Sequence, residues 1–339
     1  MNNLKIIFIG TPDFAVPNLN KLIKSNYNII SVITQPDKKV GRKQEVVFSP
    51  IKKVALKHDI PLLQPKKIKE IYNKIKELKP DIIITVAYGQ IISKNILDIP
   101  KFGCINIHGS LLPKYRGASP IQCAILKDNK KTGITIMEMN EKMDEGDIIS
   151  QKEIEINNND TASSLHDKLS TLGSALLLET LPKIFKKEIK YTPQDNNKAT
   201  YAKILKKEDG KIDWNKNANE IDSMIRAFYP WPGTYSELRI LNPCLIGRLL
   251  KRRHESMPHR QVTEEATRIK RLKIVNAGVY KISNDLKPGT IFKTKDGNLA
   301  IKCGKNSLIL EKVQLEGKKE TSGKEFLRGH ENILTQIMK

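Results

Sequence analysis

The sequence predicts a doubly wound α/β domain with a mostly parallel sheet, followed by a smaller domain of β-barrel type. Three observations lead to this expectation. In the first part of the 339-residue chain, short runs rich in Ile and Val alternate with segments whose apolar residues have helical spacing. Two later runs, 132–140 and 146–156, alternate apolar and polar residues as antiparallel strands do. Beyond residue 208, short strand-like runs split by Gly and Asn replace this pattern.

The elements of the first domain follow from local patterns. The run 4–10 (LKIIFIG) is almost wholly apolar, as strands buried on both faces of a parallel sheet are. Thr11 and Thr161 are candidate N-caps of the helices that follow them. In order, we expect strands at 4–10, 28–35, 80–88 and 103–108, helices at 11–25, 49–59 and 161–185, and antiparallel strands at 132–140 and 146–156.

The chain is long enough for two domains, each with its own core. We expect a first domain over residues 1–189 and a second over 208–339. Residues 190–207 are polar and rich in Lys and Asn, which indicates a linker. The strands expected in the second domain include 289–294 (GTIFKT), 297–304 (GNLAIKCG) and 307–315 (SLILEKVQL).

Composition narrows the class of protein. The chain is 39% hydrophobic and 28% charged, and no apolar run reaches the roughly 18 residues that a membrane helix needs. The N-terminus lacks the basic region and cleavage site of a signal peptide. The four cysteines lie far apart and form no CxxC pair, so we expect neither a disulfide framework nor a zinc site. These features predict a cytoplasmic protein without membrane contact or bound metal.

The formal net charge is +22, and the excess of Lys and Arg lies in the first hundred residues and beyond residue 200. An uneven positive field favours a polyanionic partner such as nucleic acid, although a general bias toward Lys codons gives the same total. Residues 34–50 concentrate part of this charge in Lys38, Lys39, Arg42 and Lys43. This segment is either a solvated loop or a flexible basic loop that contacts nucleic acid.

Two polar residues at the end of an expected strand are the best candidates for chemistry. In 105–113 (INIHGSLLP), Asn106 and His108 alternate with Ile, so their side chains share one face of the strand. The ligand crevice of a doubly wound sheet lies beyond such strand ends. The segment EKMDEGD could bring a carboxylate, although its spacing does not distinguish Asp144 from Glu145 or Asp147.

An imidazole, a carboxylate and an amide together suit acyl transfer, because they can move a proton and donate to a developing oxyanion. No metal or covalent intermediate is needed for this chemistry. The alternative is a purely structural role, in which the two polar side chains hydrogen-bond to each other at the edge of the sheet. The segment GTPDF after the first strand has neither GxGxxG nor GxxxxGK[ST], which argues against a dinucleotide or P-loop site.

Longer motifs resemble the folate-dependent formyltransferase family. They cover nearly the whole chain and are FIGTPDFA, TQPDKKVGR, VAYGQII, GCINIHGSLLPKYRGASPIQCAI, TGITIMEMNEKMDEGDII and IRAFYPWPGTY. The first and last of them are similar to the members that act on methionyl-tRNA. The resemblance implies a Rossmann-like catalytic domain and an OB-like C-terminal barrel that binds tRNA.

The resemblance also implies a reaction and a set of roles. The formyl group of 10-formyltetrahydrofolate would pass to the α-amino group of methionyl initiator tRNA for translation initiation, in an enzyme that we expect to be monomeric. Asn106, His108 and Asp144 would be catalytic. Ser110, Leu111, Leu112 and Pro113 would contact folate, and Arg42 would contact tRNA, with Lys38, Lys39 and Lys43 on the same loop.

The chain departs from the family at about 239–271. This segment is strongly basic, shows no strand alternation and is expected to be an insertion. It is either a tolerated surface insertion or a second arm that contacts tRNA. Three other functions remain open from the residues: a formyltransferase for a small amine, a formyltetrahydrofolate hydrolase, and a tRNA-binding protein without activity.

Overall fold

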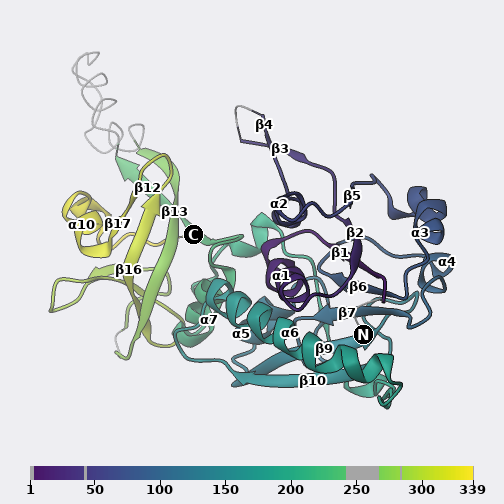
Figure 1. Cartoon of the computed structure of the whole chain (residues 1–339). Helices are drawn as coiled ribbons and strands as arrows, with labels where there is room; N and C mark the ends of the chain where they lie inside the picture. The colour runs from purple at the N-terminus through teal and green to yellow at the C-terminus, as the bar shows by residue number, and fades with distance from the viewer. Residues whose placement is uncertain (1–3, 42–43, 242–266, 283–284, 339) are drawn as a thin grey trace, which may run out of the picture. The chain divides into compact units, whose positions relative to one another are not determined.

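The computed structural model describes residues 4–41, 44–241, 267–282 and 285–338. The chain forms two compact units. The first contains Met1–Ala124 and Asn129–Ile204, and the second contains Ile125–Asp128 and Leu205–Lys339. Each unit is described by itself below (Figure 1).

A seven-stranded sheet forms the centre of the first unit, in the order β10-β9-β7-β6-β1-β2-β5. The strands from β7 to β5 in this order are parallel, whereas β9 runs antiparallel to both β7 and β10. The predicted doubly wound, mostly parallel sheet is therefore confirmed. The strands are β1 (Ile6–Gly10), β2 (Ile29–Ile33), β5 (Leu62–Leu63), β6 (Ile82–Val86), β7 (Cys104–His108), β9 (Lys131–Glu138) and β10 (Ile148–Glu155).

Helices cover both faces of this sheet (Figure 1). On one face, α1 and α6 pack against each other. On the other face, α3 and α4 pack on a core that includes Ile7, Ile9 and Cys104. The helices and 3-10 helices of this unit are η1 (Asp13–Ala15), α1 (Val16–Lys24), α2 (Pro50–Lys57), η2 (Ile68–Ile71), α3 (Tyr72–Leu78), α4 (Lys94–Leu97), α5 (Pro120–Leu126), α6 (Ala162–Phe185) and η3 (Asn196–Lys198).

The second unit is built on an antiparallel sheet in the order β12-β13-β16-β15-β14, with β17 paired to β16. The sheet curls into a half-barrel around a core that includes Trp214, Leu272 and Phe326. Among the described residues, no strand pair closes β14 onto β12. Its elements are η4 (Lys207–Gly210), α7 (Ala218–Phe228), β12 (Thr234–Leu241), β13 (Thr267–Tyr280), β14 (Ile291–Lys293), β15 (Leu299–Lys302), β16 (Ser307–Leu315), β17 (Glu320–Ser322), α10 (Gly323–Arg328) and η5 (Glu331–Ile333).

Two segments differ from the sequence-based expectation. Residues 34–50, expected as a loop, contain a small hairpin of β3 (Lys38–Val40) and β4 (Glu45–Val47). The ends of the expected insertion at 239–271 belong to β12 and β13, which pair from Thr234↔Ile274 out to Leu241↔Thr267. The charged side chains at these ends interrupt the alternation of apolar and polar residues that would have indicated strands. Residues 242–266 of the expected insertion lie outside the described residues.

The polar segment expected as a linker contains regular structure. Within it, β11 (Tyr201–Ala202) runs parallel to β8 (Arg116–Gly117), which follows the loop after β7. None of the described helices combines the length and the apolar character that a membrane crossing requires.

Candidate active site

Asn106 and His108 lie on the strand β7, near the middle of the large sheet. Ile107 faces α6, where a Cβ built on Gly173 would lie 3.2 Å from its Cγ2 atom. Because side chains alternate along a strand, Asn106 and His108 share the opposite face with Cys104. His108 is buried, with only 6% of its surface exposed, and Asn106 is half-buried.

The two ring nitrogens of His108 have different partners. Nε2 lies 2.9 Å from the backbone oxygen of Tyr115, and Nδ1 lies 3.6 Å from Oδ2 of Asp144. A carbonyl oxygen only accepts hydrogen bonds, so Nε2 carries the hydrogen. The neutral ring therefore presents the lone pair of Nδ1 on the side of Asp144, where it can take up a proton.

Asp144 lies at the centre of the site. Its Oδ2 atom accepts a hydrogen bond from the backbone N–H of Gly117 at 2.8 Å, and Oδ1 accepts one from Nδ2 of Asn106 at 3.5 Å. The backbone of Asp144 has a φ of +55°, in the left-handed region that costs a non-glycine residue free energy. The contacts around the residue must therefore hold it in place.

The other two acidic residues of this segment point elsewhere. Glu145 lies 3.4 Å from Nη1 of Arg116 and 3.7 Å from Nζ of Lys142. Asp147 lies near Glu138, whose pKa is raised by burial and, to a lesser extent, by the charge of Asp147. Geometry thus selects Asp144 as the carboxylate next to His108, a choice that spacing in the sequence left open.

The loop after β7 is held by buried hydrogen bonds. Thr135 on β9 donates to the backbone oxygen of Ser110 at 2.7 Å and accepts from the N–H of Leu112 at 3.0 Å. Gln151 on β10 donates to the backbone oxygen of Leu112 at 2.8 Å. Ser110 and Leu112 are buried, which leaves the half-buried Leu111 and Pro113 as the accessible part of the segment expected to contact folate.

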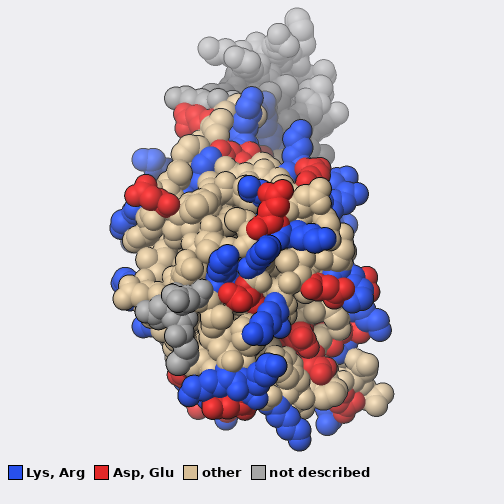
Figure 2. Space-filling model, turned by 45° about the vertical axis from the view of Figure 1, so that its right-hand side comes forward, with Lys and Arg blue, Asp and Glu red and all other residues tan. Residues whose placement is uncertain are grey.

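Two of the four basic residues expected to contact tRNA lie on the small hairpin. Lys38 and Lys39 are exposed on β3, while Arg42 and Lys43 lie outside the described residues. At the base of the hairpin, Lys52 and Gln64 bind Asp37 and lower the pKa of its carboxyl group. On the face seen in Figure 2, Lys and Arg are interspersed with Asp and Glu and do not form one continuous patch.

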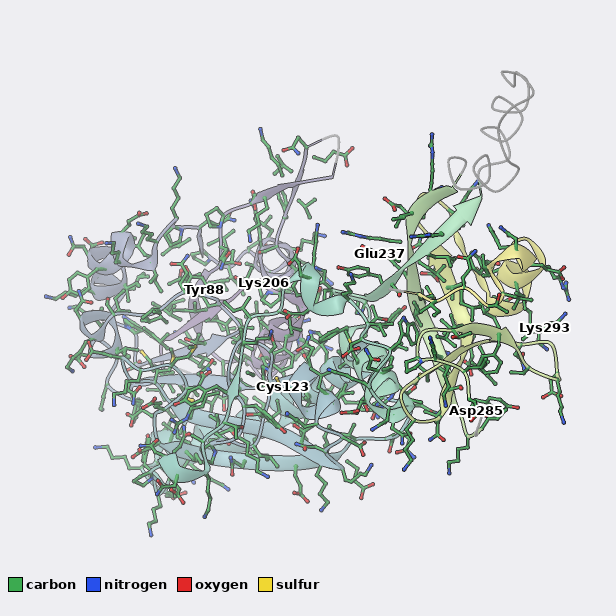
Figure 3. All side chains as sticks on the ribbon, turned by 180° about the vertical axis from the view of Figure 1, so that it is seen from behind. Tyr88, Cys123, Lys206, Glu237, Asp285 and Lys293 are labelled. Atoms are coloured by element: carbon green, nitrogen blue, oxygen red, sulfur yellow. The ribbon has the colours of Figure 1, made fainter. Side chains whose placement is uncertain are left out.

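Two buried hydroxyl groups near these strand ends have no hydrogen-bond partner among the described residues. One is Oγ1 of Thr85, which lies opposite Asn106 in the β6–β7 pair. The other belongs to Tyr88, labelled in Figure 3, whose pKa is raised by burial to about 12. Burial also raises the pKa of the Cys104 thiol, which packs in the core of the first unit.

The sequence did not predict the residues that act through backbone atoms or that come from distant parts of the sequence. Tyr115 contributes a carbonyl oxygen, Gly117 contributes an N–H group, and Gln194 comes from the segment expected to be a linker. Arg116 was part of a quoted motif, but nothing local indicated that its guanidinium is buried. In the described part of the chain, no three His, Cys, Asp or Glu side chains are grouped so that they could hold a metal ion.

Comparisons with known proteins show the family to which this chain belongs. Residues 4–181 match the family described as "Formyl transferase", and residues 204–331 match "Formyl transferase, C-terminal domain". Two proteins named methionyl-tRNA formyltransferase, from Bacillus velezensis and Bacillus pumilus, are 41% and 43% identical to this chain. Each alignment covers 96% of this chain and 94% of the relative.

Solved structures share the fold at lower identity. HypX from Aquifex aeolicus in complex with tetrahydrofolic acid has a TM-score of 0.60 at 16% identity, covering 96% of this chain and 47% of HypX. WlaRD, a sugar 3N-formyl transferase crystallised with dTDP and 5-N-formyl-THF, has a TM-score of 0.60 at 21% identity, covering 93% and 99% of the two chains.

Proposed function

Because this chain belongs to the methionyl-tRNA formyltransferase family, we propose that it transfers the formyl group of 10-formyltetrahydrofolate to the α-amino group of methionyl initiator tRNA. The observation that carries the proposal is the identity of 41–43% over 96% of the chain to relatives with that name. We also propose that this enzyme acts in the cytoplasm and as a monomer.

We propose that the methionyl amine attacks the formyl carbon directly and forms a tetrahedral intermediate. The intermediate then collapses as the bond between the formyl carbon and N10 of the folate breaks. The proton lost by the amine passes to N10, and tetrahydrofolate leaves. Asn106 donates through its side-chain amide to the oxyanion that develops on the formyl oxygen, an effect typically worth roughly 3–4 kcal/mol per donor. His108 lies beside it on the same face of β7 and supports the same charge or receives the proton of the attacking amine at Nδ1. Asp144, 3.6 Å from Nδ1, orients the ring.

We propose that the folate binds at this edge of the sheet, against the loop after β7. Leu111 and Pro113 are half-exposed on a loop whose backbone is pinned by Thr135 and Gln151. The buried hydroxyl of Thr85, without a partner among the described residues, lies next to Asn106 and is available to a polar ligand group. We propose that Ser110 and Leu112 shape this loop from inside while Leu111 and Pro113 touch the folate.

We propose that tRNA contacts the hairpin of residues 38–47. Lys38 and Lys39 are exposed there, beside the positions of Arg42 and Lys43. Exposed Lys and Arg position nucleic acid through its phosphates, and Arg adds stacking and bidentate contacts. A formyltransferase for a small amine or a hydrolase would need none of these residues.

One experiment separates the proposed function from its alternatives. The enzyme is incubated with 10-formyltetrahydrofolate labelled in the formyl group and with methionyl initiator tRNA, and label is measured on the tRNA. We expect label on the methionine amine. Label released as formate would indicate a hydrolase, label on an added amino sugar nucleotide alone would indicate a small-amine formyltransferase, and unchanged donor would indicate a binding protein.

A further inference from the structure

Gln194 links a buried arginine to the backbone of the loop that carries Asp144. Its Oε1 atom accepts hydrogen bonds from Nε and Nη2 of Arg116 at 3.0 and 2.8 Å. Its Nε2 atom donates to the backbone oxygens of Asp144 at 2.9 Å and of Gly146 at 2.7 Å. Because a guanidinium only donates and a carbonyl only accepts, this side-chain amide has a single satisfactory orientation.

The arginine that anchors this contact is buried. Arg116 is only 1% exposed, and its remaining partners are Oδ1 of Asn196 at 2.8 Å and Oε1 of Glu145 at 3.4 Å. A buried guanidinium needs such partners, since an unpaired charge in the interior is costly. Gln194 is therefore fixed on one side by the charge of Arg116 and on the other by two carbonyl groups.

The loop that Gln194 contacts needs external support. Asp144 has a left-handed backbone with a φ of +55°. At Gly146, a Cβ atom would lie 1.8 Å from the backbone oxygen of Glu138, so the chain passes too close for any side chain. Both carbonyl groups that Gln194 binds belong to this short stretch, and its hydrogen bonds fix the direction in which the Asp144 side chain leaves the backbone.

The same segment supports the partner of His108. Oγ1 of Thr200 accepts a hydrogen bond from the N–H of Tyr115 at 2.8 Å, and its backbone oxygen accepts one from the N–H of Arg116 at 2.8 Å. Tyr115 also has a left-handed backbone, with a φ of +61°, and its carbonyl oxygen binds Nε2 of His108. Residues 194–202 thus contact both loops that hold the His108–Asp144 pair.

We propose that two residues of this segment support the active site, with Gln194 as a positioning residue for Asp144 and Thr200 as one for Tyr115 and His108. This inference rests on the proposed roles of Asp144 and His108. Small displacements of catalytic groups are expensive, because a shift of about 1 Å costs on the order of a hundredfold in rate. Loss of these contacts should therefore lower kcat while leaving the substrate-binding surfaces intact.

The test compares two substitutions, each of which adds one negative charge to a side chain that binds Arg116. Gln194→Glu and Asn196→Asp each replace an amide oxygen that accepts from Arg116 with a carboxylate oxygen. Only Gln194→Glu also removes the donor to Asp144 and Gly146. We expect Gln194→Glu to lower kcat at least tenfold with both KM values within about threefold of wild type and a Tm like that of Asn196→Asp, whose kcat should stay near wild type.

A wild-type kcat for Gln194→Glu, or equal losses in the two variants, would overturn the inference. Asp144→Asn is measured alongside: if it is impaired while Gln194→Glu is normal, only the positioning role fails, and if it has normal turnover, the proposed role of Asp144 fails as well. Should Gln194→Glu not fold, Thr200→Val tests the second positioning role in the proposal, because it removes the side-chain oxygen that accepts from the N–H of Tyr115 at nearly constant volume. We expect a several-fold fall in kcat with unchanged KM, and a wild-type kcat would refute the inference.

Discussion

The backbone N–H of Gly117 donates a hydrogen bond of 2.8 Å to Oδ2 of Asp144, so a glycine of β8 holds the carboxylate that faces His108. Gly117 has a φ of +110°, a conformation that L-residues rarely adopt. A Cβ atom at this position would lie 2.6 Å from the backbone oxygen of Ala202. The position of Asp144 therefore depends on the absence of a side chain at residue 117.

Gly117→Ala should lower kcat by about tenfold or more, because the added methyl group pushes β8 away from β11 and moves the N–H group away from Asp144. Steady-state kinetics with both substrates and a thermal melt would measure the effect. Gly109→Ala, directly after β7, is the control, since its Cβ would meet Ile121 at an ordinary 3.5 Å. A Gly117→Ala enzyme with wild-type kcat would show that this hydrogen bond does not position Asp144.

Replacing His108 or Asp144 by Ala should reduce turnover by more than about a hundredfold and change the affinity for tRNA little. Both side chains act on the reacting atoms in our proposal, whereas the binding of tRNA depends on surface charge. Single-turnover rates and a filter-binding assay separate the two effects. Asp147→Asn removes a nearby carboxylate that does not contact His108 and should retain most activity, so an equal loss in that variant would contradict the assignment.

The alternation of polar and apolar residues in 105–108 predicted that Asn106 and His108 share a face, and the structure confirms this because Ile107 packs on the opposite face against α6. The other elements that follow from local patterns are the strands β1, β2, β6, β9 and β10 and the helices α1, α2 and α6. The support around the pair does not, because Gln194 is 50 residues from Asp144 and Tyr115 and Gly117 act through backbone atoms. The segment that contains Gln194 is polar because it binds backbone carbonyl groups, and in the sequence this composition looks the same as that of a linker.

Asp160, before α6, should make stability depend on pH. Burial tends to raise the pKa of its carboxyl group, but hydrogen bonds from Lys168, Ser164 and the N–H of Asn157 lower it overall. Since the folded-state pKa is below the unfolded value of about 3.9, the ionised group stabilises the fold above that pH, and this contribution is lost as the pH falls through the folded-state pKa.

We therefore expect Asp160→Asn to cost about 2 kcal/mol in free energy of unfolding at pH 7. The difference from wild type should shrink as the pH falls below 4, because the wild-type carboxylate then becomes protonated. Urea unfolding at several pH values measures both quantities. If the difference in free energy of unfolding stays constant from about pH 7 to pH 3, the ionised form of Asp160 does not stabilise the fold more than the protonated form.

Lys38→Ala/Lys39→Ala should weaken tRNA binding and reduce the salt dependence of that binding. Each lost phosphate contact lowers the slope of log K against log salt by about 0.7–0.9. The matched control is Lys21→Ala/Lys24→Ala, which removes two positive charges from α1 and should leave the slope unchanged. Equal changes in both double variants would mean that total charge, and not the hairpin, determines the affinity for tRNA.

Deleting residues 242–266 tests whether the basic segment is a passive insertion or an arm that contacts tRNA. Leu241 and Thr267 are register partners in the antiparallel pair β12–β13, so an Asn-Gly turn can join the two strands without changing their pairing. If the segment is passive, we expect the shortened enzyme to keep its Tm, its kcat and its affinity for tRNA within about threefold. A large loss of tRNA affinity with an unchanged Tm and an unchanged rate at saturating tRNA would identify the segment as a second tRNA-binding arm, because only binding would then depend on it.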